Sequence, residues 1–128
     1  MAVKWTKTAL DNLVAIVDAN GFSGAGPTSQ AINIEPLGKR FESFGWTVRE
    51  IDGNDIPTVR STLDELPDPS SEEPIVIIAR TRKGHGVEFM EKQPQAWHLG
   101  LLDAEQYADV VAEITARMEL TTSEGTAR

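Results

Sequence analysis

The apolar positions of this sequence follow two different periods, which predict alternating strands and helices. Residues 13–17 and 75–79 are apolar throughout and rich in Val and Ile, a pattern typical of strands covered on both faces of a sheet. The first of these strands extends back to residue 12, and residues 46–51 alternate as a further strand. We therefore expect the two apolar strands to lie in the centre of a sheet.

Helical spacing of apolar residues predicts four helices, at residues 2–11, 36–44, 56–66 and 103–120. Asp55 and Asp103 stand where a side-chain oxygen caps a first helical turn, and Gly45 ends the second helix. The last helix carries the apolar stripe Tyr107, Val110, Val111, Ile114 and Met118. Buried strands in alternation with helices predict the α/β class, with an open parallel sheet and flanking helices.

Two long segments, residues 21–36 and 80–100, show neither period, and we predict that they are loops. A shorter acidic loop is expected at residues 67–74. Each long loop follows an apolar strand, and in α/β sheets ligands bind beyond the carboxyl ends of the strands. Loops of this length in compact domains are usually functional, so both are candidate site loops.

Composition narrows the class of protein. The 128 residues correspond to one domain, which we expect to span residues 1–120 with a flexible tail at 121–128. The 12 basic and 20 acidic residues give a net charge of −8, which repels nucleic acids and anionic membranes. The absence of Cys excludes a disulfide framework and a thiolate site. No apolar run reaches the length of a membrane helix and no targeting signal is evident, so a soluble, cytoplasmic protein is expected.

The polar residues that end the first strand are the first candidate site. Asp18 follows the apolar run directly, and Asn20-Gly21 follows Asp18. A carboxylate and an amide at this end of a strand are well placed to meet a ligand. The same residues also suit an ordinary turn, because Asn and Asp bond nearby backbone and Gly accepts positive φ.

Longer stretches of sequence resemble one known family. LDNLVAIVDANGFSGAGPT, EPLGKRFESFGWTVREIDGNDIPTVRSTLDE, PIVIIARTRKGHGVEFME and WHLG occur in the order typical of the thiamine-diphosphate-binding domain of transketolases, especially their separate N-terminal subunits. The resemblance covers nearly the whole chain. It implies a partial thiamine-diphosphate-binding fold, with thiamine diphosphate as the cofactor.

The resemblance also implies roles for single residues. Asn20 would bind Mg²⁺ or Ca²⁺ through its amide oxygen and Phe22 through its backbone carbonyl, and Gly21 would lie beside the cofactor. These hard oxygen donors suit such ions. His98 would reach the cofactor diphosphate and the donor-sugar hydroxyls, and it is the candidate catalytic residue, as imidazole can change its charge near neutral pH. Asp18 would orient the turn.

Some parts of the family pattern are different or missing. Family members usually carry Ile-Asp-Gly where this chain has Gly24-Ala25-Gly26, so any role of that Asp is lost here. His85 is read as a loop residue, with surface charge at Arg82 and Lys83. Neither Gly-Asp-Gly, which would hold the other metal ligand, nor a pyrimidine-binding domain with its activating Glu occurs, and Met1 falls inside the helix that would follow Gly-Asp-Gly.

These gaps imply partner chains. One would carry the Gly-Asp-Gly half of the cofactor domain and one the pyrimidine-binding domain, and bare apolar surface on the first helix and first strand would be covered by them. The leading hypothesis is one subunit of a split, heteromeric transketolase that moves a two-carbon ketol unit from a ketose donor to an aldose or other acceptor and is inactive alone. Three alternatives remain open: one subunit of a 2-oxo acid decarboxylase and acyl transferase, a non-catalytic scaffold subunit, and a free-standing small α/β binding domain.

Overall fold

The computed structural model describes residues 13–66 and 73–125 of the chain. The expected helix at residues 2–11 and most of the acidic loop at 67–74 lie outside the described residues. The chain divides into two compact units, Met1–Arg82 and Lys83–Arg128. Within the described residues, no helix combines the length and apolar character needed to cross a membrane.

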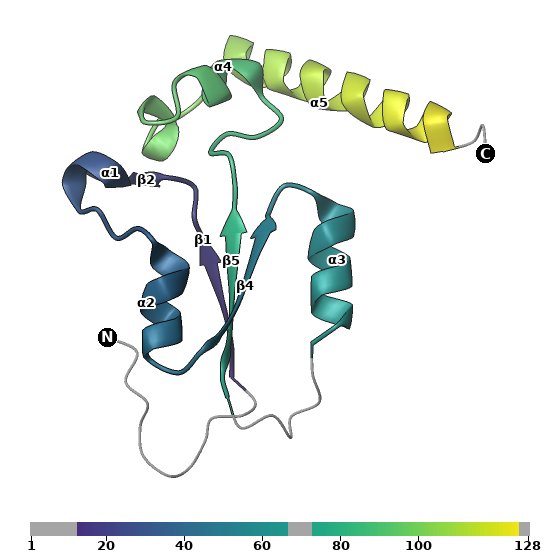
Figure 1. Cartoon of the computed structure of the whole chain (residues 1–128). Helices are drawn as coiled ribbons and strands as arrows, with labels where there is room; N and C mark the ends of the chain where they lie inside the picture. The colour runs from purple at the N-terminus through teal and green to yellow at the C-terminus, as the bar shows by residue number, and fades with distance from the viewer. Residues whose placement is uncertain (1–12, 67–72, 126–128) are drawn as a thin grey trace. The chain divides into compact units, whose positions relative to one another are not determined.

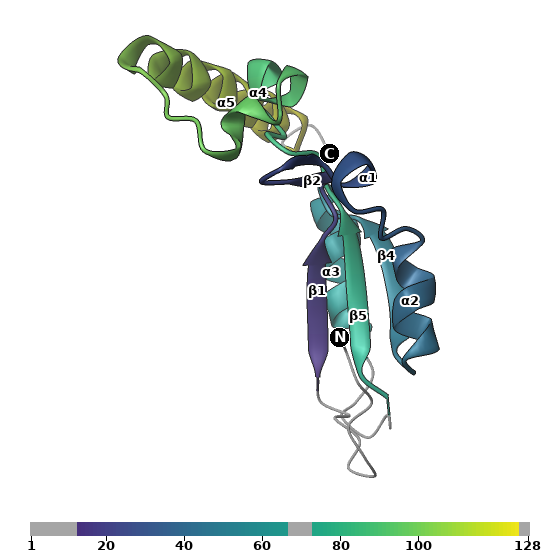
Figure 2. The same ribbon diagram turned by 90° about the vertical axis from the view of Figure 1, so that its left-hand side faces the viewer.

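The first unit is built on a parallel sheet of three strands in the order β1-β5-β4. The strands are β1 (Val14–Asp18), β4 (Thr47–Asp52) and β5 (Ile75–Arg80). Figures 1 and 2 show the arrows side by side and pointing the same way, with β5 in the middle. In this register Asp18 lies opposite Ala79 and Asp52 lies opposite Arg80. The carboxyl ends of all three strands therefore meet at one end of the sheet.

The two apolar strands differ in burial. Residues 75–79 of β5 are all buried, as predicted for a central strand. In β1, by contrast, Val14 is 40% and Ile16 is 64% exposed, so the face that carries these two side chains is largely bare. β1 also forms an edge of the described sheet and pairs there only with β5. The prediction that β1 is central and covered on both faces is therefore wrong for this sheet. The exposed apolar face of β1 agrees with the expectation that this strand carries apolar surface that the chain itself leaves uncovered.

Helices α2 (Leu37–Ser43) and α3 (Ile56–Asp64) lie on opposite sides of the sheet (Figure 1). The chain crosses from β1 over β5 to β4 through α2 and returns from β4 to β5 through α3. Since parallel crossovers are right-handed, connections in opposite directions place their helices on opposite faces. The Asp55 carboxylate accepts the Thr58 N–H at 3.3 Å, which confirms the predicted cap. The predicted apolar face of α3 is only partly covered, because Ile56 is 70% exposed.

The expected loop at 21–36 contains short elements instead. Phe22–Ser23 (β2) and Gly26–Pro27 (β3) form a small antiparallel hairpin, and Thr28–Ala31 forms the single turn α1. The segment predicted as a loop thus includes a two-stranded hairpin and one helical turn. Elements of two to four residues are too short for any period to appear in the sequence.

The second unit consists of helices. It contains α4 (Glu88–Lys92), the 3₁₀ helix η1 (Ala96–His98) and α5 (Ala104–Gly125), so the loop predicted at 80–100 contains two short helices. The Asp103 carboxylate accepts the backbone N–H of Gln106, and the side-chain oxygen of Gln106 accepts the backbone N–H of Asp103. These reciprocal hydrogen bonds confirm the predicted cap of α5. Helix α5 continues beyond residue 120 to Gly125 and therefore includes part of the expected tail. Its predicted apolar stripe is largely exposed, including Tyr107, Val111, Ile114 and Met118.

Candidate functional site

The carboxyl end of β1 forms a turn that fixes the side chain of Asn20. The amide nitrogen of Asn20 donates a hydrogen bond to Asp18 Oδ2 at 3.1 Å, and Asn20 Oδ1 accepts the N–H of Phe22 at 2.9 Å. The two contacts are possible together only in one orientation of the amide. Asp18 therefore determines which way the amide oxygen of Asn20 faces, in agreement with the orienting role expected from the sequence.

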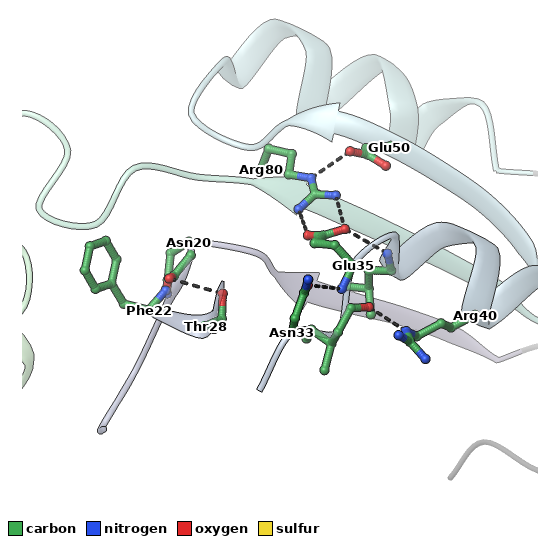
Figure 3. Close-up of polar contacts among 11 residues, drawn as sticks. Asn20, Phe22, Thr28, Asn33, Glu35, Arg40, Glu50 and Arg80 are labelled. Carbon is green, nitrogen blue, oxygen red and sulfur yellow. Dashed lines mark hydrogen bonds and ion pairs between the residues drawn. The ribbon is translucent and has the colours of Figure 1, made fainter. Parts of the chain in front are cut away.

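Gly21 closes this turn onto the following hairpin. Its φ of 79° lies in the left-handed region, which residues with a Cβ rarely adopt. The carbonyl of Gly21 accepts the N–H of Thr28 at 2.9 Å and the Thr28 hydroxyl at 3.2 Å. Figure 3 shows Thr28 beside the turn formed by Asn20 and Phe22. Gly21 is thereby held to Thr28, the first residue of α1.

The carbonyl of Phe22 is not used by the hairpin. Phe22 is opposite Pro27, which has no N–H to donate. The neighbouring hydrogen bond runs from Thr28 to Gly21, and in an antiparallel pair the bonded and non-bonded positions alternate. Phe22 therefore occupies a non-bonded position, and its carbonyl oxygen is directed away from β3.

These two oxygens fit a hard divalent cation. An amide oxygen has two acceptor sites, so Asn20 Oδ1 can bind an ion while it accepts the Phe22 N–H. Neutral amide and carbonyl oxygens are ligands that Mg²⁺ and Ca²⁺ accept, and a diphosphate would add the negative charge. Within the described residues, no group of three or more His, Cys, Asp or Glu side chains could hold a metal ion. The turn is therefore the candidate cation-binding element.

Thr81 connects this turn to the central strand. Its hydroxyl donates a hydrogen bond to Asp18 Oδ1, and the N–H of Ala19 donates to the carbonyl of Ala79 at 2.8 Å. The chain just after β4 lies at the same end of the sheet, where Asn54 Oδ1 accepts the N–H of Arg82 at 2.7 Å. Sequence patterns did not identify Thr81, because its role depends on the pairing of β1 with β5.

An ion-pair network lies at the same end of the sheet, around Arg80. The Arg80 guanidinium binds both carboxylate oxygens of Glu35, and Arg80 Nε donates to Glu50 Oε1 at 2.6 Å (Figure 3). The hydrogen bonds from Arg80, and then the one from the Leu37 N–H, lower the pKa of Glu35 from 4.5 to about 2. Glu35 and then Glu50 raise the pKa of Arg80. This network was not predicted; the one signal in the sequence is a charge that directly follows the apolar run of β5.

His98 belongs to the second unit, at the end of η1. Its backbone N–H donates to the carbonyl of Gln95 at 3.2 Å, and within the described chain its exposed imidazole makes no hydrogen bond or ion pair. The adjacent Trp97 packs edge-on against Phe89, with ring centroids 5.1 Å apart. A Cβ on Gly100 would lie 2.7 Å from the Ala96 carbonyl, so the chain beyond His98 turns tightly over η1. The backbone of His98 is fixed while its side chain remains available.

The other histidine is engaged within the second unit. His85 Nδ1 lies 3.1 Å from Glu91 Oε1, and the same oxygen accepts the N–H of Gly86 at 2.8 Å. This contact holds residues 85–86 against α4, in accordance with a structural loop residue. His98 is therefore the better candidate for contact with a substrate.

Comparison with known proteins gives one consistent group. The family model for the transketolase thiamine diphosphate binding domain matches residues 4–117. A protein of Phocaeicola vulgatus named as one of the subunits of apulose-4-phosphate transketolase is 37% identical over 110 residues, which make up 86% of this chain and 38% of that protein. The protein of the same name from Actinobacillus succinogenes is 44% identical over 89 residues, 70% of this chain and 31% of that protein.

Complete transketolases are also similar. The transketolase of Rattus norvegicus is 30% identical over 110 residues, 86% of this chain and 17% of the rat protein. The crystal structure of transketolase from Campylobacter jejuni matches with a TM-score of 0.56 at 33% identity, over 64% of this chain and 12% of that chain. This chain thus spans less than two fifths of the length of each of these relatives.

Proposed function

Because this chain belongs to the family of transketolase thiamine diphosphate-binding domains, we propose that it is one subunit of a split, heteromeric transketolase-like enzyme. The enzyme transfers a two-carbon ketol unit with thiamine diphosphate and a divalent metal ion, Mg²⁺ or Ca²⁺. A phosphorylated sugar as substrate is supported by the relatives named for apulose 4-phosphate. The cytoplasm is the compartment that we propose for it.

The observation that carries this proposal is the turn from Asn20 to Phe22. One turn offers a side-chain oxygen and a backbone carbonyl oxygen that no ladder partner occupies. In our proposal, Asn20 and Phe22 bind the ion through these oxygens, and the ion joins them to the cofactor diphosphate. Gly21 keeps the backbone of the turn free of a side chain beside the cofactor.

The remaining chemistry divides between cofactor and protein. When bound, thiamine diphosphate stabilises the negative charge that develops on carbon as a carbon–carbon bond of the donor ketose breaks. His98 binds the donor hydroxyls and holds or moves the proton at a reacting hydroxyl oxygen. Imidazole suits this task because both protonation states are accessible near neutral pH.

Partner chains complete the proposed site. The family's Gly-Asp-Gly element, with its Asp ligand, and the Glu that activates the cofactor come from other parts of the assembly. This division is supported by relatives whose names describe them as subunits of a transketolase. The bare apolar face of β1 supports it too, because such surfaces usually pack against another chain.

The first experiment is to isolate this chain with the proteins that co-purify with it and to titrate the complex with Mg²⁺ and thiamine diphosphate. In the Asn20→Ala variant we expect Mg²⁺-dependent cofactor binding to weaken by about tenfold or more, because loss of groups that merely support a metal ligand already costs about 10- to 100-fold in affinity. Asn54→Ala is the matched control, since it also removes an amide oxygen that accepts a backbone N–H at a strand end. Equal, undiminished cofactor binding in both variants would refute the proposed metal site.

Substrate assays with the same complex test the reaction. Transfer from a ketose phosphate to an aldose supports a transketolase, whereas activity only with pyruvate would favour the 2-oxo acid decarboxylase alternative. A complex that turns over equally well with and without this chain would favour a scaffold role.

A further inference from the structure

The segment between β1 and α2 carries the candidate metal ligands, and burial contributes little to its position. Gly26 is the only residue between Asn20 and Pro36 that is buried. Ile32 is 73% exposed and Ile34 is 41% exposed, so these two apolar side chains are not inserted into a core, and Phe22 is only half-buried. Its elements β2, β3 and α1 span two to four residues each, too few to be stable alone.

Polar contacts attach both ends of this segment to the carboxyl end of β5. At its start, the Thr81 hydroxyl binds the Asp18 carboxylate. At its end, Arg80 binds both oxygens of the Glu35 carboxylate, with 3.1 Å between Nη2 and Oε2. Arg80 and Thr81 are consecutive, so two neighbouring residues at the end of the central strand hold the two ends of one loop.

The Arg80 contact has the geometry of a strong ion pair. Two parallel hydrogen bonds between guanidinium and carboxylate fix both position and plane, unlike a single contact to a Lys ammonium. Glu50, on the neighbouring strand β4, occupies the remaining Nε–H at 2.6 Å and thus fixes the guanidinium itself. Figure 3 shows Arg80 between the two carboxylates.

The residues around Glu35 extend this attachment to α2. The Glu35 carboxylate accepts the N–H of Leu37 at 2.8 Å, and Asn33 Oδ1 accepts the N–H of Glu35 at 3.1 Å. Arg40 Nε donates to the carbonyl of Ile34 at 2.6 Å. Three consecutive residues of an exposed segment are thereby held in hydrogen bonds.

We propose that Arg80 and Glu35 are positioning residues that hold the segment on the sheet and so preorganise the oxygens of Asn20 and Phe22 for the divalent ion. They act through the backbone: Glu35 fixes the end of the segment, α1 begins seven residues earlier at Thr28, and Thr28 binds Gly21 between the two ligands. Neither residue contacts ion or cofactor. The metal-binding part of this inference rests on the proposed function, whereas the positional part does not.

Hydrogen exchange tests the positional part on the complete chain with its co-purifying partners and without cofactor. In Arg80→Gln we expect amide exchange across residues 21–36 to rise about tenfold or more, since polar contacts replace burial there. Arg80→Lys should restore only part of the protection. Arg49→Gln is the matched control: Arg49 also binds two acceptors, the carbonyls of Thr62 and Glu65, but holds α3 instead. Unchanged exchange over 21–36 in Arg80→Gln would overturn the inference.

Cofactor titration tests the metal-binding part. If the binding-competent arrangement falls to about a tenth of the population in Arg80→Gln, apparent Mg²⁺ and cofactor affinities fall about tenfold while kcat at saturation is retained. Glu35→Gln should behave in the same way. Asn20→Ala separates the two proposals, because it removes a ligand instead of its support. If Asn20→Ala weakens binding and Arg80→Gln does not, the positioning role is refuted; if neither does, the proposed metal site fails with it.

Discussion

The hydroxyl of Thr81 donates a hydrogen bond to the carboxylate of Asp18, so that the ends of β5 and β1 are joined by side chains as well as by the ladder. Through its other oxygen the same carboxylate orients the amide of Asn20. Thr81 therefore influences the direction of the Asn20 oxygen from a neighbouring strand, without reaching the turn itself.

Thr81→Val tests this relationship, because Val has nearly the shape of Thr and lacks only the hydroxyl. The Asp18 carboxylate should then hold the Asn20 amide less firmly, and Mg²⁺ affinity should fall about tenfold, as for other groups that support a metal ligand. Asp18→Asn should have a larger effect, since an amide at this position can rotate to offer a donor in place of an acceptor. Calorimetric Mg²⁺ titration of the assembled protein measures both. Thr58→Val, which removes a hydroxyl from α3, is the control, and an equal effect there would contradict the explanation.

The pair of Arg80 and Glu35 should make stability depend on pH in a defined window. The pKa of Glu35 is about 2 in the folded chain against an ordinary value of 4.5, so the folded state favours the ionised carboxylate. Its contribution is complete above pH 4.5 and is lost as pH falls through about 2. Urea unfolding of the wild type and Arg80→Gln should therefore show a stability difference that is constant near neutral pH and shrinks below pH 4.5. A difference that grows on acidification would contradict the ion pair.

Substitution of the two histidines should have different effects on kcat/KM. His98→Ala should lower kcat/KM for the ketose donor by roughly 100-fold, the usual scale for loss of a proton-transfer group. His85→Ala removes the other imidazole of the chain, which contacts Glu91, and should change kcat/KM little. Steady-state assays with the assembled enzyme measure both values. Equal losses in the two variants would mean that the second unit responds as a whole and that His98 has no special role.

The capping of α5 gives a prediction that does not depend on function. Asp103→Ala removes the acceptor for the N–H of Gln106, which lies at 2.8 Å, and should lower the free energy of unfolding by about 1 kcal/mol. Asp109→Ala on the same helix is the control, with an expected change within about 0.5 kcal/mol. Chemical denaturation monitored by circular dichroism provides the measurement. An equal loss in both variants would show that acidic charge, and not the cap, is responsible.

Local patterns in the sequence predicted the elements that depend on neighbouring residues. The apolar run of β5 predicted its central place, and Asp55 and Asp103 cap their helices as expected. The Asn20 turn was also predicted, because Asn-Gly after a strand specifies its own geometry. For the two caps and the turn, the determining contacts lie within three residues of one another, whereas the central place of β5 follows from its apolar composition.

Other features depend on contacts between distant residues, which no local pattern contains. Arg80 meets Glu35 across 45 positions, and Thr81 meets Asp18 across 63. The edge position of β1 follows from the strand order, since an apolar run has the same sequence whether its second neighbour is present or not. The roles of Gly21 beside the cofactor and of His98 toward the substrate remain predictions.

The strand order also has a consequence for how this sheet is made. β5 is the last of the three strands to be synthesised, yet it separates the first two, which have no ladder with each other. While a ribosome is still adding residue 74, β1 and β4 have no partner in this sheet. Their pairing must then form across long stretches of chain, which slows folding. Arg80 and Thr81, at the end of this last strand, are the residues that fix the candidate metal site, so the sheet and the site should appear in the same folding step.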